Sequence, residues 1–207
     1  MKIFYTAEKN VQILIQLMKR HGVRKIVASP GSTNICFVAS VQQDSFFEIY
    51  SSIDERSAAY IACGLAAESG EPVAISCTGA TASRNYMPGL TEAYYRHLPV
   101  LAITSTQSIE RLGHNIPQII DRTVVPNDLV YLSVRLPIVH DEETEWSCVA
   151  KVNNALLELK RNGCGPVHID LTTEYNTDFS VKELPDVRKI DRFCLNDQMP
   201  PLKHGNI

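Results

Sequence analysis

The alternation of short apolar runs with segments of helical periodicity constrains this chain more than any other feature of its sequence. Apolar residues recur at helical spacing over about residues 7–20, and Gly22 is well placed to end that helix. The apolar run at 25–28 is too short for a helix and is typical of a buried strand. This pairing of helix and strand then recurs along the chain.

The repeated alternation of strand-like and helix-like segments predicts five strands and five helices. Strands are expected at about 25–28, 46–53, 73–77, 100–104 and 167–171. Helices are expected at about 7–20, 34–41, 58–69, 83–95 and 149–159. Strands that alternate with helices of this length indicate an α/β fold, a three-layer sandwich with a mostly parallel central sheet and helices on both faces.

Length and composition limit the kinds of protein that this chain can be. Its 207 residues fit one large domain, expected at 1–182, followed by an aperiodic, proline-containing segment at 183–207 that is typical of a linker. A formal net charge of −3 gives no electrostatic case for binding nucleic acid or an anionic membrane surface. No apolar run approaches the roughly 20 residues that span a bilayer. The six cysteines form no Cys-x-x-Cys pair, which favours reduced, mostly buried thiols in a cytoplasmic protein and no protein-held metal.

Chemistry in parallel sheets collects in the loops at the carboxyl ends of the strands. Four such loops are expected here, at 29–34, 54–57, 78–85 and 105–121. Glu55 lies in the second loop, near a helix N-terminus. Its carboxylate either favours the positive end of the helix dipole, worth about 0.3–1 kcal/mol, or handles a proton at the mouth of the sheet. Position alone does not decide between these roles.

The small residues of the other loops also admit two interpretations. The turn at Thr78 and Gly79 either cradles an anion on free backbone N–H groups or allows close packing of helix and strand. It is neither a Walker A loop nor a Gly-x-Gly-x-x-Gly fingerprint. The turn at Gly31 admits the same two interpretations. His114 lies in a long loop of the kind that is often functional, although a lone histidine is more often structural.

Several ordered motifs together resemble the N-terminal, pyrimidine-binding domain of thiamine diphosphate-dependent enzymes. The motifs are Ser-Pro-Gly-Ser-Thr-Asn at 29–34, Asp-Glu-Arg-Ser-Ala-Ala at 54–59, Cys-Thr-Gly-Ala at 77–80, Glu-Ala-Tyr-Tyr at 92–95 and Gly-Pro-Val-His-Ile-Asp-Leu at 165–171. The resemblance is to the acetolactate synthase and 2-oxo-acid decarboxylase/carboligase family. Within it, the chain is most similar to the menaquinone-pathway synthases that join 2-oxoglutarate to isochorismate.

The resemblance implies roles for individual residues. Glu55 becomes the glutamate that hydrogen-bonds N1′ of the aminopyrimidine and passes it a proton, so that the cofactor is activated to attack a 2-oxo acid. The loop that packs around the aminopyrimidine ring corresponds to Thr78, Gly79 and Asn85, and Gly31 faces the substrate. Gln118 matches the glutamine that orients the substrate or intermediate, with His114 as a further candidate for proton transfer.

Two departures and one absence from the family pattern limit these implications. Thr33 stands where the menaquinone-pathway synthases carry an arginine for a substrate carboxylate, which argues against isochorismate as substrate. Pro117 stands where phenylalanine is usual. The Gly-Asp-Gly motif, through which the family binds Mg²⁺ and the diphosphate in a C-terminal domain, does not occur in this sequence.

The chain is therefore expected to carry one half of an active site. The resemblance implies a homodimer or higher oligomer, with the diphosphate-binding domain supplied by the same enzyme or by a separate subunit. The segment at 183–207 would then be a stump of the linker to an absent middle domain. The alternative is a non-catalytic α/β module that binds a nucleotide or acts as a regulatory subunit.

Overall fold

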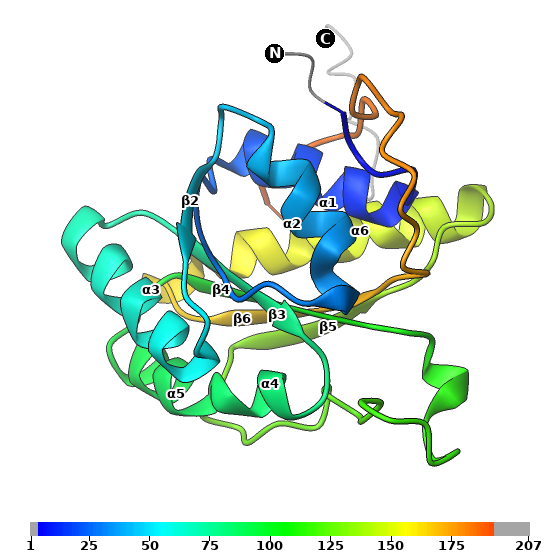
Figure 1. The fold of residues 1–207 in the computed structure, drawn as a ribbon. Coiled ribbons are helices and arrows are strands. Elements are labelled where there is room, and N and C mark those ends of the chain that lie inside the picture. The colour runs from blue at the N-terminus through cyan, green and yellow to red at the C-terminus, as the bar shows by residue number, and fades with distance from the viewer. Residues whose placement is uncertain (1–3, 193–207) are drawn as a thin grey trace, which may run out of the picture.

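Six parallel strands form the central sheet of the computed structural model, which describes residues 4–192 (Figure 1). Their order across the sheet is β2-β1-β3-β4-β6-β5. The strands are β1 (Lys25–Ala28), β2 (Glu48–Ser51), β3 (Val73–Thr78), β4 (Val100–Thr106), β5 (Leu132–Leu136) and β6 (Val167–Thr172). The expected α/β fold is confirmed.

Helices cover both faces of this sheet and bury an apolar core on each. The α-helices are α1 (Lys9–His21), α2 (Ile35–Gln42), α3 (Glu55–Ser69), α4 (Thr81–Asn85), α5 (Met87–Tyr95) and α6 (Glu142–Glu158). Helices α1, α2 and α6 cover one face, and α3, α4 and α5 cover the other (Figure 1). Large aliphatic side chains such as Leu14 and Leu17 fill the first core, whereas alanines such as Ala58 and Ala62 let α3 lie close to the sheet in the second.

Glycine residues end two of the helices, and an aspartate caps the start of one of these. Gly22 and Gly70 end α1 and α3 in the left-handed conformation, with φ of 77° and 66°, where glycine carries no Cβ penalty. The predicted end of the first helix at Gly22 is therefore confirmed. Asp54 caps α3, its Oδ1 accepting the backbone N–H of Ser57 at 2.7 Å.

The structure also differs from the predicted elements. Strand β5 lies outside the predicted elements: its apolar residues Leu132, Val134 and Leu136 alternate with polar ones and form no continuous apolar run like those of the other buried strands. The helix expected at 83–95 is two helices, since Pro88 lacks the N–H that would continue the backbone ladder. Helix α3 begins at Glu55, three residues before the expected start, and it buries mainly alanines, whereas its larger Ile61 is 43% exposed.

The segment after residue 182 remains in contact with the domain. Val187 is buried in the core of the α1 face, and its carbonyl accepts a hydrogen bond from Arg20. Asn153 of α6 donates to the carbonyl of Arg188 at 3.0 Å and accepts from the N–H of Ile190 at 2.8 Å. The first part of the expected linker thus packs on the domain, while 193–207 lies outside the described residues. Where the domain ends stays a prediction.

Within residues 4–192, none of the helices combines the length and apolar character that crossing a membrane requires.

Two glycines on neighbouring helices test the packing of α3 against α5. A Cβ added at Gly89 would collide with Ala59 and lie 3.0 Å from its carbonyl carbon, whereas a Cβ at Gly64 meets no atom within 4 Å. We expect Gly89→Ala to lower the free energy of unfolding by about 1–3 kcal/mol. Gly64→Ala should raise it by about 0.5–1 kcal/mol, because alanine is the better helix former.

Urea denaturation of both variants measures these changes. Equal effects of the two substitutions would contradict the close approach of the helices.

Candidate functional site

The carboxyl ends of the strands bring the predicted loops to one edge of the sheet. The loops at 29–34, 54–57, 78–85 and 105–121 follow β1, β2, β3 and β4, and all these strands are parallel. The connection from β1 leads outward to β2, whereas the connection from β3 leads to β4 on the opposite side. The gap between β1 and β3 is therefore the topological switch point, where open α/β sheets bind ligands.

Glu55 lies at this edge as the first residue of α3. The cap at Asp54 fixes the first turn of the helix, and the Glu55 side chain is half-buried. Asn85, the last residue of α4, donates its Nδ2–H to Glu55 Oε2 at 3.3 Å. The structure thus brings together two residues that the sequence analysis placed at one site. None of the ion pairs within the described residues involves Glu55.

Buried, uncharged side chains lie behind Glu55. Burial raises the pKa of Cys77 to about 12 and that of Tyr86 well above its ordinary value, and the nearby charge of Glu55 adds to both effects. Both groups are therefore neutral at physiological pH. The buried hydroxyls of Tyr86 and Ser29 have no partner in good hydrogen-bond geometry within residues 4–192. They lie close enough to interact with each other, and Tyr86 also interacts with the thiol of Cys77. Buried hydroxyls without a well-formed hydrogen bond are costly in a packed interior.

The turn at Gly31 packs directly against Thr78. A Cβ at Gly31 would collide with the Thr78 methyl group, so glycine permits this contact. Asn34 holds the turn closed: its Oδ1 accepts the Gly31 N–H at 2.8 Å and its Nδ2–H donates to the Ser29 carbonyl at 3.1 Å. Gly31 and Thr78, predicted separately, are neighbours.

Gly79 is buried beneath the loop that follows β4. A Cβ at this position would collide with Nη1 of Arg122 and lie 3.1 Å from the carbonyl oxygen of Ser105. The next residue, Ala80, has φ of 56° and ψ of −134°, a strained conformation for a residue with a Cβ. Close packing thus accounts for the glycine, in agreement with one of its two interpretations.

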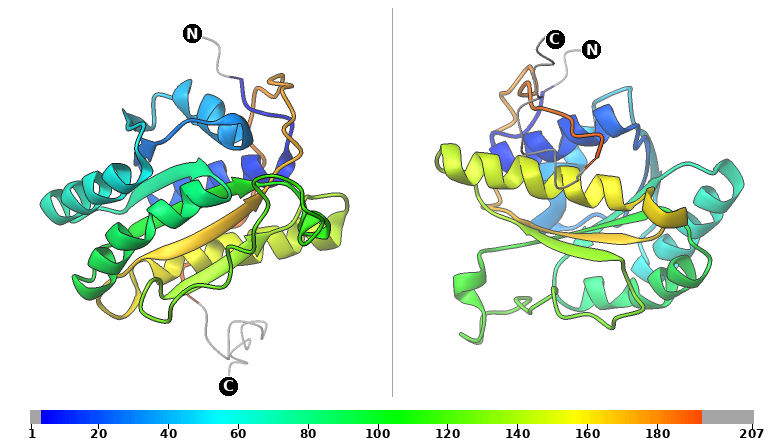
Figure 2. Two further views of the ribbon diagram at one scale, coloured as in Figure 1. Left: turned by 60° about the horizontal axis from the view of Figure 1, so that its bottom comes forward. Right: turned by 180° about the vertical axis from the view of Figure 1, so that it is seen from behind.

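His114 and Gln118 lie apart from the residues above. Both are exposed in the loop after β4, which leaves the edge of the sheet (Figure 2). Within the described residues, no side-chain hydrogen bond joins either of them to Glu55. Gln118 has φ of 65°, in the left-handed region. The structure therefore assembles Glu55, Asn85, Thr78, Gly79 and Gly31 but leaves the two loop residues at the periphery.

A buried cluster of charges that was not among the predicted residues lies next to this site. Arg122 and Asp170 are each 1% exposed and form an ion pair. Arg135 Nε donates to the other oxygen of Asp170 at 2.7 Å, and its Nη2 lies 3.2 Å from Asp121 Oδ1. One signal was available: an aspartate, Asp170, lies in the segment predicted as a buried strand, and a buried carboxylate needs a cationic partner.

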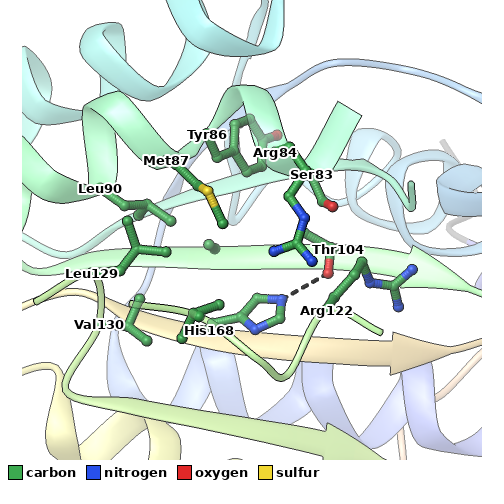
Figure 3. A pocket seen from close by; sticks show the side chains of 12 residues that line it. Ser83, Arg84, Tyr86, Met87, Leu90, Thr104, Arg122, Leu129, Val130 and His168 are labelled. Carbon is green, nitrogen blue, oxygen red and sulfur yellow. Dashed lines mark hydrogen bonds between the residues drawn. The ribbon is translucent and has the colours of Figure 1, made fainter. Parts of the chain in front are cut away.

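A small pocket next to the charge cluster separates α4 and α5 from the sheet (Figure 3). Apolar side chains of Met87, Leu90 and Leu129 line one part of it, and the fully buried His168 lies opposite. The imidazole shares hydrogen bonds with Thr104 Oγ1 at 2.7 Å and Ser133 Oγ at 2.8 Å. Burial, aided by the neighbouring arginines, lowers the pKa of His168 to about 3, so it is neutral and structural.

Comparison with known proteins identifies the family. The profile described as "Thiamine pyrophosphate enzyme, N-terminal TPP binding domain" matches residues 9–125. The chain belongs to this family. A curated relative from Phocaeicola vulgatus, named 2-succinyl-5-enolpyruvyl-6-hydroxy-3-cyclohexene-1-carboxylate synthase, is 40% identical over 190 residues. A synthase of the same name from Bacteroides thetaiotaomicron is also 40% identical over 190 residues.

The aligned region corresponds to only a part of each of these relatives. Each alignment covers 91% of this chain but 34% of the relative, so the chain spans about a third of the length of these curated proteins. A putative thiamin diphosphate-dependent enzyme from Mycobacterium smegmatis has the same fold, with a TM-score of 0.70 and 22% identity over 87% of this chain and 34% of its own. The thiamine diphosphate-dependent 4-hydroxybenzoylformate decarboxylase of Rhodococcus jostii RHA1 gives a TM-score of 0.69, with 20% identity over 86% of this chain and 32% of its own.

The residues at the sheet edge fit the pyrimidine end of the cofactor. A heteroaromatic ring with several nitrogens needs hydrogen-bonding groups beside an apolar surface. The TPP-binding domain offers the half-buried Glu55 carboxylate and the buried hydroxyls of Ser29 and Tyr86. Within residues 4–192, no group of three or more histidine, cysteine or acidic side chains could hold a metal ion.

The pKa of His168 predicts a pH-dependent loss of stability. Between about pH 6.5 and pH 3 the unfolded chain protonates this histidine while the folded chain does not, so acidification favours unfolding. The wild type should therefore lose about 2 kcal/mol relative to His168→Gln as the pH falls from 6.5 to 5.

Chemical denaturation of both proteins across this pH range measures the difference. If the free energy of unfolding changes equally with pH in wild type and variant, His168 is not the source of the pH dependence.

Proposed function

We propose that this TPP-binding domain forms the pyrimidine-binding half of the active site in an enzyme that decarboxylates a 2-oxo acid and ligates the product to a second carbonyl. The single observation that carries the proposal is the position of Glu55. It is a half-buried carboxylate at the switch point of the sheet, without a cationic partner and beside Asn85. The relatives are named as synthases, which supports ligation after decarboxylation.

Glu55 acts in this proposal by holding and moving one proton. Its carboxyl group donates a hydrogen bond to N1′ of the aminopyrimidine and takes the proton back later in the cycle. When bound, the thiamine diphosphate supplies a nucleophilic carbon and an electron sink for the decarboxylation. Neutral Cys77 and Tyr86 exclude water behind the carboxylate, and Asn85 orients it through the 3.3 Å hydrogen bond.

The other predicted residues surround the ring and the substrate. Thr78 and Gly79 pack around the aminopyrimidine, and Gly31 faces the substrate. We assign Gln118 to orienting the 2-oxo acid and His114 to proton transfer. Both lie exposed on the loop after β4, which leaves them available to a ligand bound over the sheet edge.

The site needs a second protein part for the diphosphate and Mg²⁺. No Gly-Asp-Gly motif occurs in the chain, and its relatives are about three times as long. We infer that a diphosphate-binding domain, in the same enzyme or a separate subunit, faces this one across a homodimer or higher oligomer. Exposed apolar residues at α3 support such a contact: Ile53 is 92% exposed, Tyr60 48% and Ile61 43%.

Two further inferences concern the substrate and the compartment. Thr33 is 4% exposed, and its hydroxyl donates to the Ser105 carbonyl at 2.7 Å, so it presents no cation to a carboxylate. We therefore propose an acceptor other than isochorismate. The five cysteines within residues 4–192 are free thiols, and Cys36, Cys63, Cys77 and Cys148 are buried, which supports a cytoplasmic enzyme.

Substitution of Glu55 tests the proposal in the assembled enzyme, which contains this chain and its diphosphate-binding domain. Glu55→Gln keeps the shape of the side chain but cannot donate and retake the proton, so kcat should fall at least about 100-fold. The matched control is Glu68→Gln, at an exposed position near the other end of α3, which should leave kcat unchanged.

Steady-state decarboxylation assays measure both variants. Near-normal turnover of the Glu55 variant, with its melting temperature unchanged, would reject the proposal.

A further inference from the structure

Arg122 is the largest fully buried side chain in the described part of the protein. It belongs to the loop after β4, four residues beyond Gln118, and is 1% exposed. Loop arginines ordinarily extend into solvent, because burying a guanidinium removes its hydration. Burial lowers the pKa of Arg122 to about 10, so it remains a cation at neutral pH.

The guanidinium contacts two functional parts of the sheet edge. Its Nη1 occupies the space over Gly79 that a Cβ would need. Its Nη2 forms the ion pair with Asp170 at the carboxyl half of β6. Arg122 therefore lies between the turn after β3 and the end of β6, and it anchors the loop after β4 there.

A second arginine makes the reciprocal contact. Arg84, in α4 just after the Gly79 turn, donates its Nη2–H to the backbone carbonyl of Asp121 at 2.8 Å. Thus Arg84 reaches from the turn to the loop, and Arg122 reaches from the loop to the turn. These opposed contacts join the two segments at adjacent residues, 121 and 122.

The burial of Arg122 is not optimised for stability. Within residues 4–192, Nε and Nη1 of Arg122 make no hydrogen bond, and Nη2 is engaged by the ion pair with Asp170. A buried charge without its full set of hydrogen bonds destabilises a fold, and an apolar side chain of similar size is often more stable there. Within the described residues, the ion-pair partner of this guanidinium is the equally buried Asp170.

We propose that Arg122 is a positioning residue that couples the Thr78–Gly79 turn to the loop carrying His114 and Gln118. Through it, the part of the site that surrounds the aminopyrimidine and the part that orients the substrate keep one relative arrangement. The inference rests on the proposed function for the roles of these segments, while the coupling itself concerns this chain alone.

Amide hydrogen exchange on the 207-residue chain tests the coupling without any cofactor. In Arg122→Met, segments 78–85 and 113–122 should exchange at least about tenfold faster than in wild type. The matched control is Arg135→Met: Arg135 pairs with the same Asp170 but is not among the atoms that crowd Gly79. Its exchange at 78–85 should stay within about twofold of wild type. Equal exchange in the two variants would overturn the proposal.

Kinetics of the assembled enzyme provide the functional readout. Arg122→Met should raise the KM for thiamine diphosphate at least about tenfold at a temperature well below its melting point, while Arg135→Met should not. A merely structural role would lower the melting temperature and leave this KM unchanged. If Arg122→Met does not fold, Arg122→Lys replaces it, because lysine keeps the charge for Asp170 but does not fill the space over Gly79.

The two proposals fail in different ways. If the wild-type enzyme does not bind thiamine diphosphate, the proposed function is wrong, and hydrogen exchange alone still decides whether Arg122 couples the two segments. If the enzyme binds the cofactor but Arg122→Met and Arg135→Met have the same KM and exchange rates, the positioning role is wrong and the proposed function stands.

Discussion

The hydrogen bond from the Ser57 N–H to Asp54 Oδ1 fixes the feature on which the site depends, the start of α3. At 2.7 Å it caps the helix directly after the loop from β2. Because the edge strand β2 runs parallel to β1, that helix must start at the carboxyl edge of the sheet. Glu55, the next residue, is thereby delivered to the switch point, where Asn85 contacts it.

The rest of the site is built by the close approach of backbone segments. Gly31 lets the first loop rest on Thr78, and Gly79 makes room for Arg122. Each contact joins the loop after one strand to the loop after another, so the loops form one continuous surface. Such a surface contacts one side of a ligand. This agrees with the length of the chain, which spans about a third of its relatives.

The sequence was informative where local chemistry decides structure. Gly22 could be predicted to end a helix because its left-handed conformation is a property of one residue. Glu55 could be placed at the sheet edge because strand and helix periodicity order the elements around it. Strand β5 was harder to find, because it is five residues long, only every second residue is apolar, and it is stabilised by pairing with β6, which is distant in sequence. The burial of Arg122 also escaped prediction, since its partner Asp170 is 48 residues away and no local pattern joins them.

The central claim is that Glu55 exchanges a proton with the cofactor ring. The most direct measurement is the rate at which deuterium replaces the C2 proton of thiamine diphosphate in the assembled enzyme, followed by NMR after acid quench. The account predicts that this rate falls at least about 100-fold in Glu55→Gln, with the cofactor still bound. An exchange rate equal to that of wild type would contradict it.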